Sequence, residues 1–155
     1  MNLFDLGWDD FASKSFHPFC SGDLVPARVA LGHKHACELL SAHGELLAEC
    51  TGRLLHETAS HADLPAVGDW VMLRGLENLA QQLAARDATA AQARREGPVQ
   101  IYKILPRKTA LVRRLNADEQ LLAANIDYVF LGSSLNENFN LRRLERYLAL
   151  ARDSG

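Results

Sequence analysis

The sequence predicts a mainly β fold, in which short strands close into a small barrel and are followed by the beginning of an α/β unit. Between residues 25 and 105, short apolar segments alternate with turn residues. The run 63–73 contains a Pro-Ala-Val-Gly-Asp turn that leads into a Trp-Val-Met-Leu strand, which is typical of a barrel changing direction. After residue 119, a nearly continuous apolar segment precedes an amphipathic helix.

Residues 1–24 are predicted to form an N-terminal arm. The arm is rich in large apolar side chains, namely Phe4, Leu6, Trp8, Phe11, Phe16 and Phe19. Large aromatic residues are usually buried, so this segment is interpreted as an arm or short helix packed on the domain that follows. An arm that docks on a partner is the alternative.

The short strands follow the arm. They are predicted at residues 25–31, 36–40, 45–50 with a continuation toward 55, 69–74 and 99–105. Such spacing fits a closed barrel or a sandwich, and small barrels often bind RNA or DNA. Residues 76–96 are rich in Ala, Gln and Leu and predict an insertion, part helix and part mobile loop.

A basic stretch follows the last of these strands. Residues 99–114 contain no acid. They carry the cations Lys103, Arg107, Lys108, Arg113 and Arg114. Either this stretch is a solvated linker or it contacts phosphate groups.

The C-terminal part predicts a buried strand at 126–131 and a helix from Leu141 that Asn140 caps. This order is the first half of a βαβ unit, and the returning strand is missing. A single β-α piece leaves apolar surface uncovered, so the chain is inferred to be a fragment of a longer protein. Alternatively, the piece folds back on the barrel, or strand 126–131 pairs with a second copy.

Composition limits the possible function classes. The 155 residues suffice for one domain and part of another, and the net charge of −2 argues against a uniformly basic nucleic-acid binder. The three cysteines lack C-x-x-C spacing, so no zinc site is expected. With neither a basic leader nor a membrane-length apolar stretch, the sequence predicts a cytoplasmic protein without membrane contact.

The sequence contains no recognisable catalytic motif. The phosphate-binding patterns G-x-x-x-x-G-K-[ST] and G-x-G-x-x-G are absent, as are N-K-x-D, H-E-x-x-H and G-x-S-x-G. His33 and His35 alternate about a turn without acids or cysteines at ligand spacing. No catalytic, cofactor-binding or metal-ligating residue is therefore predicted within these residues.

Several segments together resemble the small ribosomal subunit-dependent GTPases, the circularly permuted bacterial GTPases of ribosome maturation. The matching runs are LGWDDF (6–11), VPARV (25–29), GRL (52–54), LPAVGDWV (64–71), LPRKTAL (105–111), AANIDYVF (123–130) and NFNLRRLERYL (138–148). The LPAVGDWV run and the NLRRLERYL helix are specific in combination. The resemblance covers nearly the whole chain.

The resemblance implies an arm (1–24), a five-stranded OB-fold barrel (25–114, with the insertion 76–96) and the truncated start of a permuted GTPase domain (115–155). In the intact protein it implies GTP, and zinc in a C-terminal domain. The nucleotide motifs of the family would lie beyond residue 155, so this chain alone is expected to be inactive. Two departures are the long insertion and the polar residues 132–134.

For the barrel, the resemblance implies contact with the rRNA of the small subunit. By residue type, the predicted RNA-binding residues are Arg28, Lys34, Lys103, Arg107, Lys108, Arg113 and Arg114. The alternatives are a stand-alone OB-fold that binds single-stranded nucleic acid, and a protein-interaction module that uses the Phe-rich arm.

Overall fold

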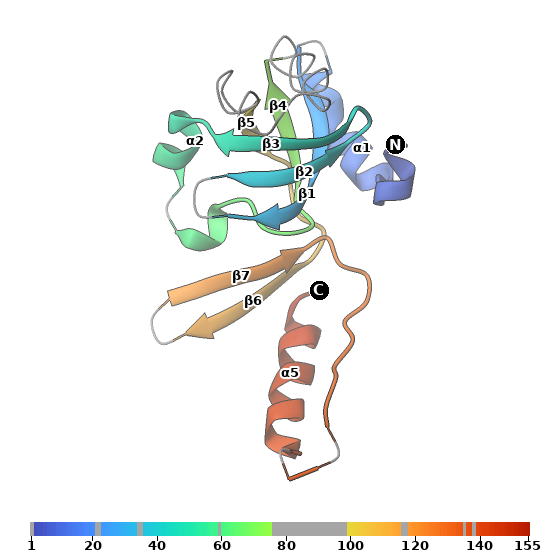
Figure 1. Cartoon of the computed structure of the whole chain (residues 1–155), viewed down its shortest axis with the longest axis vertical. Coiled ribbons are helices and arrows are strands. Elements are labelled where there is room, and N and C mark those ends of the chain that lie inside the picture. Colours follow the sequence, from blue (N-terminus) through green and yellow to red (C-terminus); the bar gives the residue numbers. More distant parts are fainter. Residues whose placement is uncertain are drawn as a thin grey trace, which may run out of the picture.

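A closed five-stranded barrel dominates the computed structural model, which describes residues 2–20, 23–33, 36–58, 60–75, 99–115, 118–134, 136–137 and 139–155 (Figure 1). The barrel strands are β1 (Val25–Gly32), β2 (Cys37–Ser41), β3 (Gly44–Cys50), β4 (Trp70–Arg74) and β5 (Val99–Ile104). They join in the order β1-β2-β3-β5-β4, and β1 also pairs with β4. Only the β3–β5 pair is parallel among these five strands. The predicted OB-fold barrel is confirmed.

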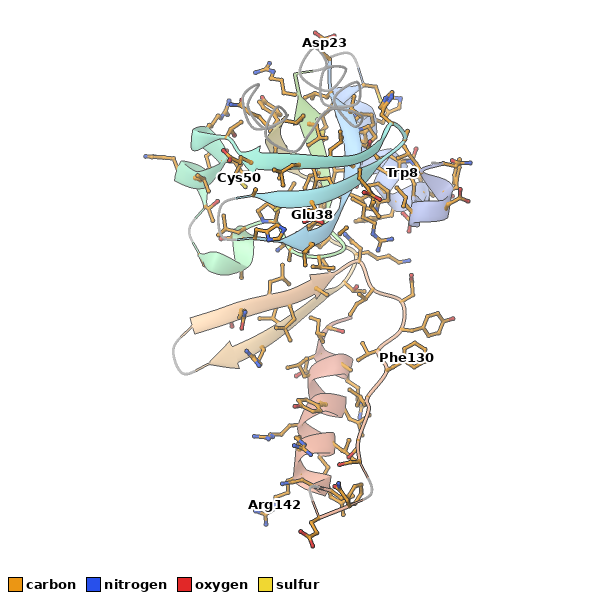
Figure 2. The ribbon with its side chains drawn as sticks, in the orientation of Figure 1. Trp8, Asp23, Glu38, Cys50, Phe130 and Arg142 are labelled. Carbon is orange, nitrogen blue, oxygen red and sulfur yellow. The ribbon has the colours of Figure 1, made fainter. Side chains whose placement is uncertain are left out.

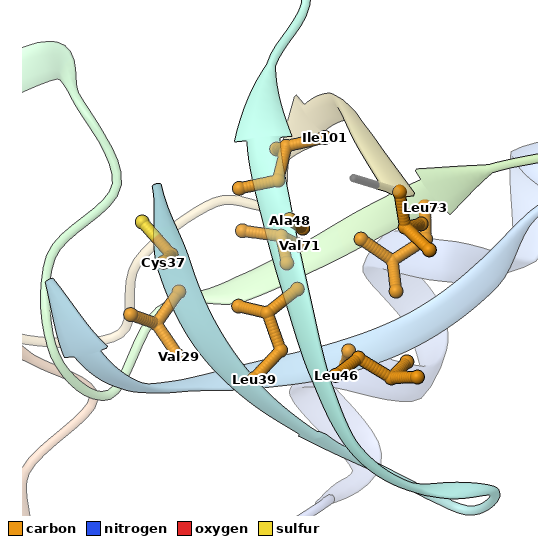
Figure 3. Close-up of a cluster of buried hydrophobic side chains, with 10 residues drawn as sticks. Val29, Cys37, Leu39, Leu46, Ala48, Val71, Leu73 and Ile101 are labelled. Atoms are coloured by element: carbon orange, nitrogen blue, oxygen red, sulfur yellow. The ribbon is translucent and has the colours of Figure 1, made fainter. Parts of the chain in front are cut away.

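The barrel interior is a packed apolar core (Figure 3). Alternate residues along each strand point inward, because side chains in a strand have a period of two. The largest fully buried apolar side chains of this core are Val29, Leu39, Val71, Val99 and Ile101. The barrel therefore encloses its own apolar core.

The N-terminal arm packs on the outside of the barrel, as its first interpretation predicted. It consists of η1 (Phe4–Leu6), α1 (Asp10–Phe16) and η2 (His17–Phe19). The Trp8 ring meets the Trp70 ring edge-on at 4.7 Å between centroids. Together with Phe16 and Phe19, Trp8 covers the outer side chains Trp70 and Met72. These contacts hold the arm on the barrel, while Phe4 and Phe11 of the same arm stay exposed.

Two elements between the strands differ from the prediction or were missed by it. The expected continuation of β3 toward residue 55 is wrong, because residues 52–57 form helix α2 (Gly52–Glu57). The Thr51 hydroxyl oxygen accepts a hydrogen bond from the Leu54 amide at 3.2 Å, which is an N-cap, and this cap favours a helix over further strand. A short turn, η3 (His61–Asp63), precedes β4.

Part of the basic stretch forms a strand that the sequence did not reveal. Strand β6 (Ala110–Leu115) pairs with β7 (Asp118–Ala124) in an antiparallel hairpin below the barrel (Figure 1). The predicted domain boundary at 114/115 lies within this hairpin, and the division into domains stays a prediction. The insertion 76–96 lies outside the described residues.

The predicted strand at 126–131 is wrong, because these residues form no hydrogen-bonded ladder. A strand needs a neighbour, and no described segment pairs with this one. The side chains of Tyr128 and Phe130 are 83% and 94% exposed, and Figure 2 shows Phe130 projecting away from the protein. The final helix forms as predicted, as α5 (Leu141–Asp153) capped by Asn140.

Among the described helices, none combines the length and the apolar character that crossing a membrane requires.

Candidate nucleic-acid interface

Arg107, one of the predicted RNA-binding residues, is held inside the protein. Its guanidinium donates to both carboxylate oxygens of Asp69, from Nε at 2.8 Å and from Nη2 at 2.9 Å. It also donates to the carbonyl oxygens of Ala62 at 2.7 Å and Leu64 at 2.9 Å. Asp69 is fully buried and also accepts a hydrogen bond from the Ala66 amide at 2.8 Å. Arg107 therefore fixes the loop before β4.

Arg28 is likewise engaged by the protein. From β1 it donates to the carbonyl oxygens of Leu6, of Gly68 at 3.3 Å and of Asn125 at 2.9 Å. Its guanidinium also lies 5.7 Å from the centroid of the Trp70 ring. The side chain thus ties the arm, the turn before β4 and the end of the hairpin together. The hydrogen-bond donors of Arg28 and Arg107 already have protein acceptors. Both side chains are therefore poorly placed to bind RNA phosphates.

Lys108 is exposed but has acidic neighbours. Its Nζ lies 3.5 Å from Asp9 Oδ2 and 3.7 Å from Asp127 Oδ1. The pKa of Asp9 is lowered, first by the hydrogen bond from the Ala12 amide and then by Lys108, against the opposing effect of burial. The two carboxylates offset the charge that Lys108 offers to a phosphate.

Of the other predicted cations, Arg113 is described on the β6–β7 hairpin. Arg113 is exposed on the hairpin and donates from Nη2 to Gln120 Oε1 at 2.9 Å. Lys34 lies outside the described residues, and so does the side chain of Arg114. The contacts given for Arg28, Arg107, Lys108 and Arg113 show no single cluster among the described members of the predicted set.

Lys103 is an exposed predicted cation that lies beside an aromatic side chain. It is exposed on β5, and its Nζ lies 4.6 Å from the centroid of the Phe19 ring. On the neighbouring strand, the guanidinium of Arg74 lies 4.9 Å from the centroid of the Tyr102 ring. Arg74 is absent from the predicted set, although its position at the end of the Trp-Val-Met-Leu strand was visible in the sequence.

The outer face of β2 and β3 is acidic. Its exposed side chains include Glu38, Glu45 and Glu49, and Figure 2 shows Glu38 on β2. His33 pairs with Glu38 at 2.8 Å. Many OB-folds bind nucleic acid on the face of strands 2 and 3, but here three carboxylates would face the phosphates. Charge therefore disfavours this face as an RNA surface.

The described residues include no group of three metal-ligating side chains placed to share an ion. Cys37 is buried and Cys50 is half-buried. Burial raises the pKa of the Cys37 thiol, with a smaller contribution from Asp69. Burial, and then Cys37, raise the pKa of the Cys50 thiol to about 11. Protonated thiols of this kind are poor ligands and poor nucleophiles.

Known proteins resemble this chain along its whole length. Residues 104–155 match the family model described as RsgA GTPase. A protein of Opitutus terrae named small ribosomal subunit biogenesis GTPase RsgA is 55% identical over 99% of this chain. A protein of the same name from Syntrophotalea carbinolica is 37% identical over the whole chain. The chain spans 40% of the length of each of these two relatives.

A solved structure supports the fold. The crystal structure of YjeQ from Thermotoga maritima superposes with a TM-score of 0.51 at 17% identity. The alignment covers 84% of this chain and 38% of that one.

Proposed function

We propose that this chain belongs to the RsgA GTPase family, and that it is the rRNA-binding part of a GTPase that assists late maturation of the small (30S) ribosomal subunit. The observation that carries this proposal is the match of the whole chain to relatives named for small ribosomal subunit biogenesis. The OB-fold barrel supports it, since such barrels commonly bind nucleic acid.

Under this proposal, GTP hydrolysis belongs to the intact protein. These residues lack a phosphate-binding loop and an N-K-x-D motif, so the isolated chain neither binds GTP tightly nor hydrolyses it. The zinc that the resemblance implies would also be held by residues outside this chain. The partner is the small subunit and its rRNA, and the location is the cytoplasm. Self-association through residues 126–131 stays a prediction.

Binding to purified small subunits tests the proposal. The 155-residue chain should co-sediment with immature 30S particles, and the binding should weaken steeply as salt rises, because phosphate contacts release counterions. A fluorescent GTP analogue should show no tight binding to the same sample. Failure to bind 30S particles or their rRNA at low salt would overturn the proposal, and so would stoichiometric GTP binding. Capture of proteins but no RNA after nuclease treatment would instead support an interaction module.

A further inference from the structure

We propose that single-stranded RNA lies across the outer face of β4 and β5, where bases stack beside Tyr102 and the cations Arg74 and Lys103 contact phosphates. This inference rests on the proposed function and assigns the RNA to a face different from β2 and β3. Of the RNA-binding residues predicted from the sequence, only Lys103 belongs to this surface.

A β-bulge brings the key side chains to the same side of the barrel. In the β4–β5 ladder, Met72 faces Lys103 while Leu73 faces Ile101, so Tyr102 is the additional residue. Leu73 and Ile101 belong to the barrel core. Tyr102 instead packs on the outer cluster that contains Met72. The bulge thus places Tyr102 and Lys103 next to each other on the outside.

Cations and aromatic rings alternate along this face. Arg74, which pairs with Gln100, places its guanidinium over the Tyr102 ring. Lys103 places its ammonium over the Phe19 ring of the arm. Nucleobases stack on aromatic rings and on guanidinium planes, while the positive charges attract the phosphates between them. We call these four residues, Phe19, Arg74, Tyr102 and Lys103, the cation–aromatic row.

The row meets two requirements of a single-strand site that the acidic face does not meet. Arg74 and Lys103 are both exposed, so a phosphate can reach them. Phe19 and Tyr102 are half-buried, which holds each ring in place and leaves part of it open to a base. A fixed platform loses little conformational entropy when a base stacks on it.

Fluorescence anisotropy with the full 155-residue chain tests the row. The probes are a short fluorescein-labelled single-stranded RNA of mixed sequence and an RNA duplex of the same length. Wild type should prefer the single strand. Tyr102→Leu should weaken single-strand binding about 10-fold, whereas Tyr102→Phe should retain it, because stacking needs the ring and not the hydroxyl. Lys103→Ala should reduce the salt slope by about 0.7, the value for one phosphate contact on a single strand.

Control variants test whether a loss of RNA binding is specific to the cation–aromatic row. Arg142→Ala removes an exposed cation from α5, and Glu38→Gln removes an exposed carboxylate from β2. Neither should change single-strand affinity by more than about 2-fold. Because Tyr102→Leu can loosen the outer cluster, its thermal midpoint is measured, and the exposed Lys103→Ala decides the outcome if Tyr102→Leu unfolds.

The outcomes distinguish this proposal from the proposed function. If wild type binds 30S particles but Lys103→Ala and Tyr102→Leu bind RNA like wild type, the RNA does not contact the cation–aromatic row. The proposed function is then unaffected. Equal affinity for duplex and single strand would also overturn the stacking role. If wild type binds neither particles nor RNA, both proposals fail.

Discussion

Replacing Arg107 by Ala should destabilise the barrel strongly. The change deletes four hydrogen bonds and leaves the carboxylate of Asp69 buried, with the Ala66 amide as the one remaining partner found for it among the described residues. Removing one partner of a buried ion pair typically costs about 3–5 kcal/mol, since the other charge stays desolvated. We expect a loss of this size in the free energy of unfolding.

Urea unfolding, followed by far-UV circular dichroism and by Trp fluorescence, measures this loss. Trp70 lies next to Asp69, so fluorescence reports on the barrel directly. Arg113→Ala is the control, because an exposed arginine should change stability by no more than about 0.5 kcal/mol. The double variant Asp69→Asn/Arg107→Ala should recover part of the loss, since it leaves no buried charge. A loss below about 1 kcal/mol for Arg107→Ala would refute the reasoning.

Three further predictions concern single sites. Gly68→Ala should cost about 3 kcal/mol in a urea titration, because Gly68 has φ +89° and a Cβ would lie 2.0 Å from the Ala124 carbonyl oxygen. The Cys50 thiol, with its pKa raised to about 11, should react with iodoacetamide at pH 8 far more slowly in the folded protein than after unfolding in guanidinium. Asp9→Ala should cost about 1 kcal/mol at pH 7, measured in urea, because the N-cap of α1 is lost. The lowered pKa of Asp9 means that its contribution is complete above its ordinary value of 3.8 and disappears as pH falls below it.

Each of these predictions has a matched control. Gly52→Ala should be neutral or slightly stabilising, because nothing lies within 4 Å of a Cβ there. Cys20 is exposed and should label first, so rapid labelling of Cys50 in the folded state would contradict the burial argument. Asp9→Asn keeps a good N-cap, and its stability should therefore follow that of wild type more closely at low pH than at pH 7. Equal losses for Asp9→Ala at pH 2 and pH 7 would contradict the assignment.

The sequence predicted the barrel because short apolar segments separated by turn residues are a local signal for short strands. It also located α5, because the capping Asn and the apolar residues at helical spacing are signals that lie within one short segment. The β6–β7 hairpin was missed because the run from Ala110 to Leu115 carries no clear alternation. The strand at 126–131 was predicted wrongly, because apolar character alone does not supply a hydrogen-bonded neighbour.

The candidate interface was predicted less well than the fold. Residue type identified the cations, and Lys103 does lie on an exposed face beside an aromatic ring. Residue type could not show that the donors of Arg107 and Arg28 would meet protein acceptors from distant segments. The placement of Tyr102 beside Arg74 depends on a bulge between two strands, which no single segment encodes.

The sequence by itself determined the barrel strands, helix α5 and the family resemblance, because each follows from patterns within short runs of residues. Only the tertiary structure decided which cations stay exposed and which donate hydrogen bonds to distant parts of the protein. The physical reason is that a guanidinium satisfies its five donors wherever acceptors converge, and convergence depends on residues far apart in the chain.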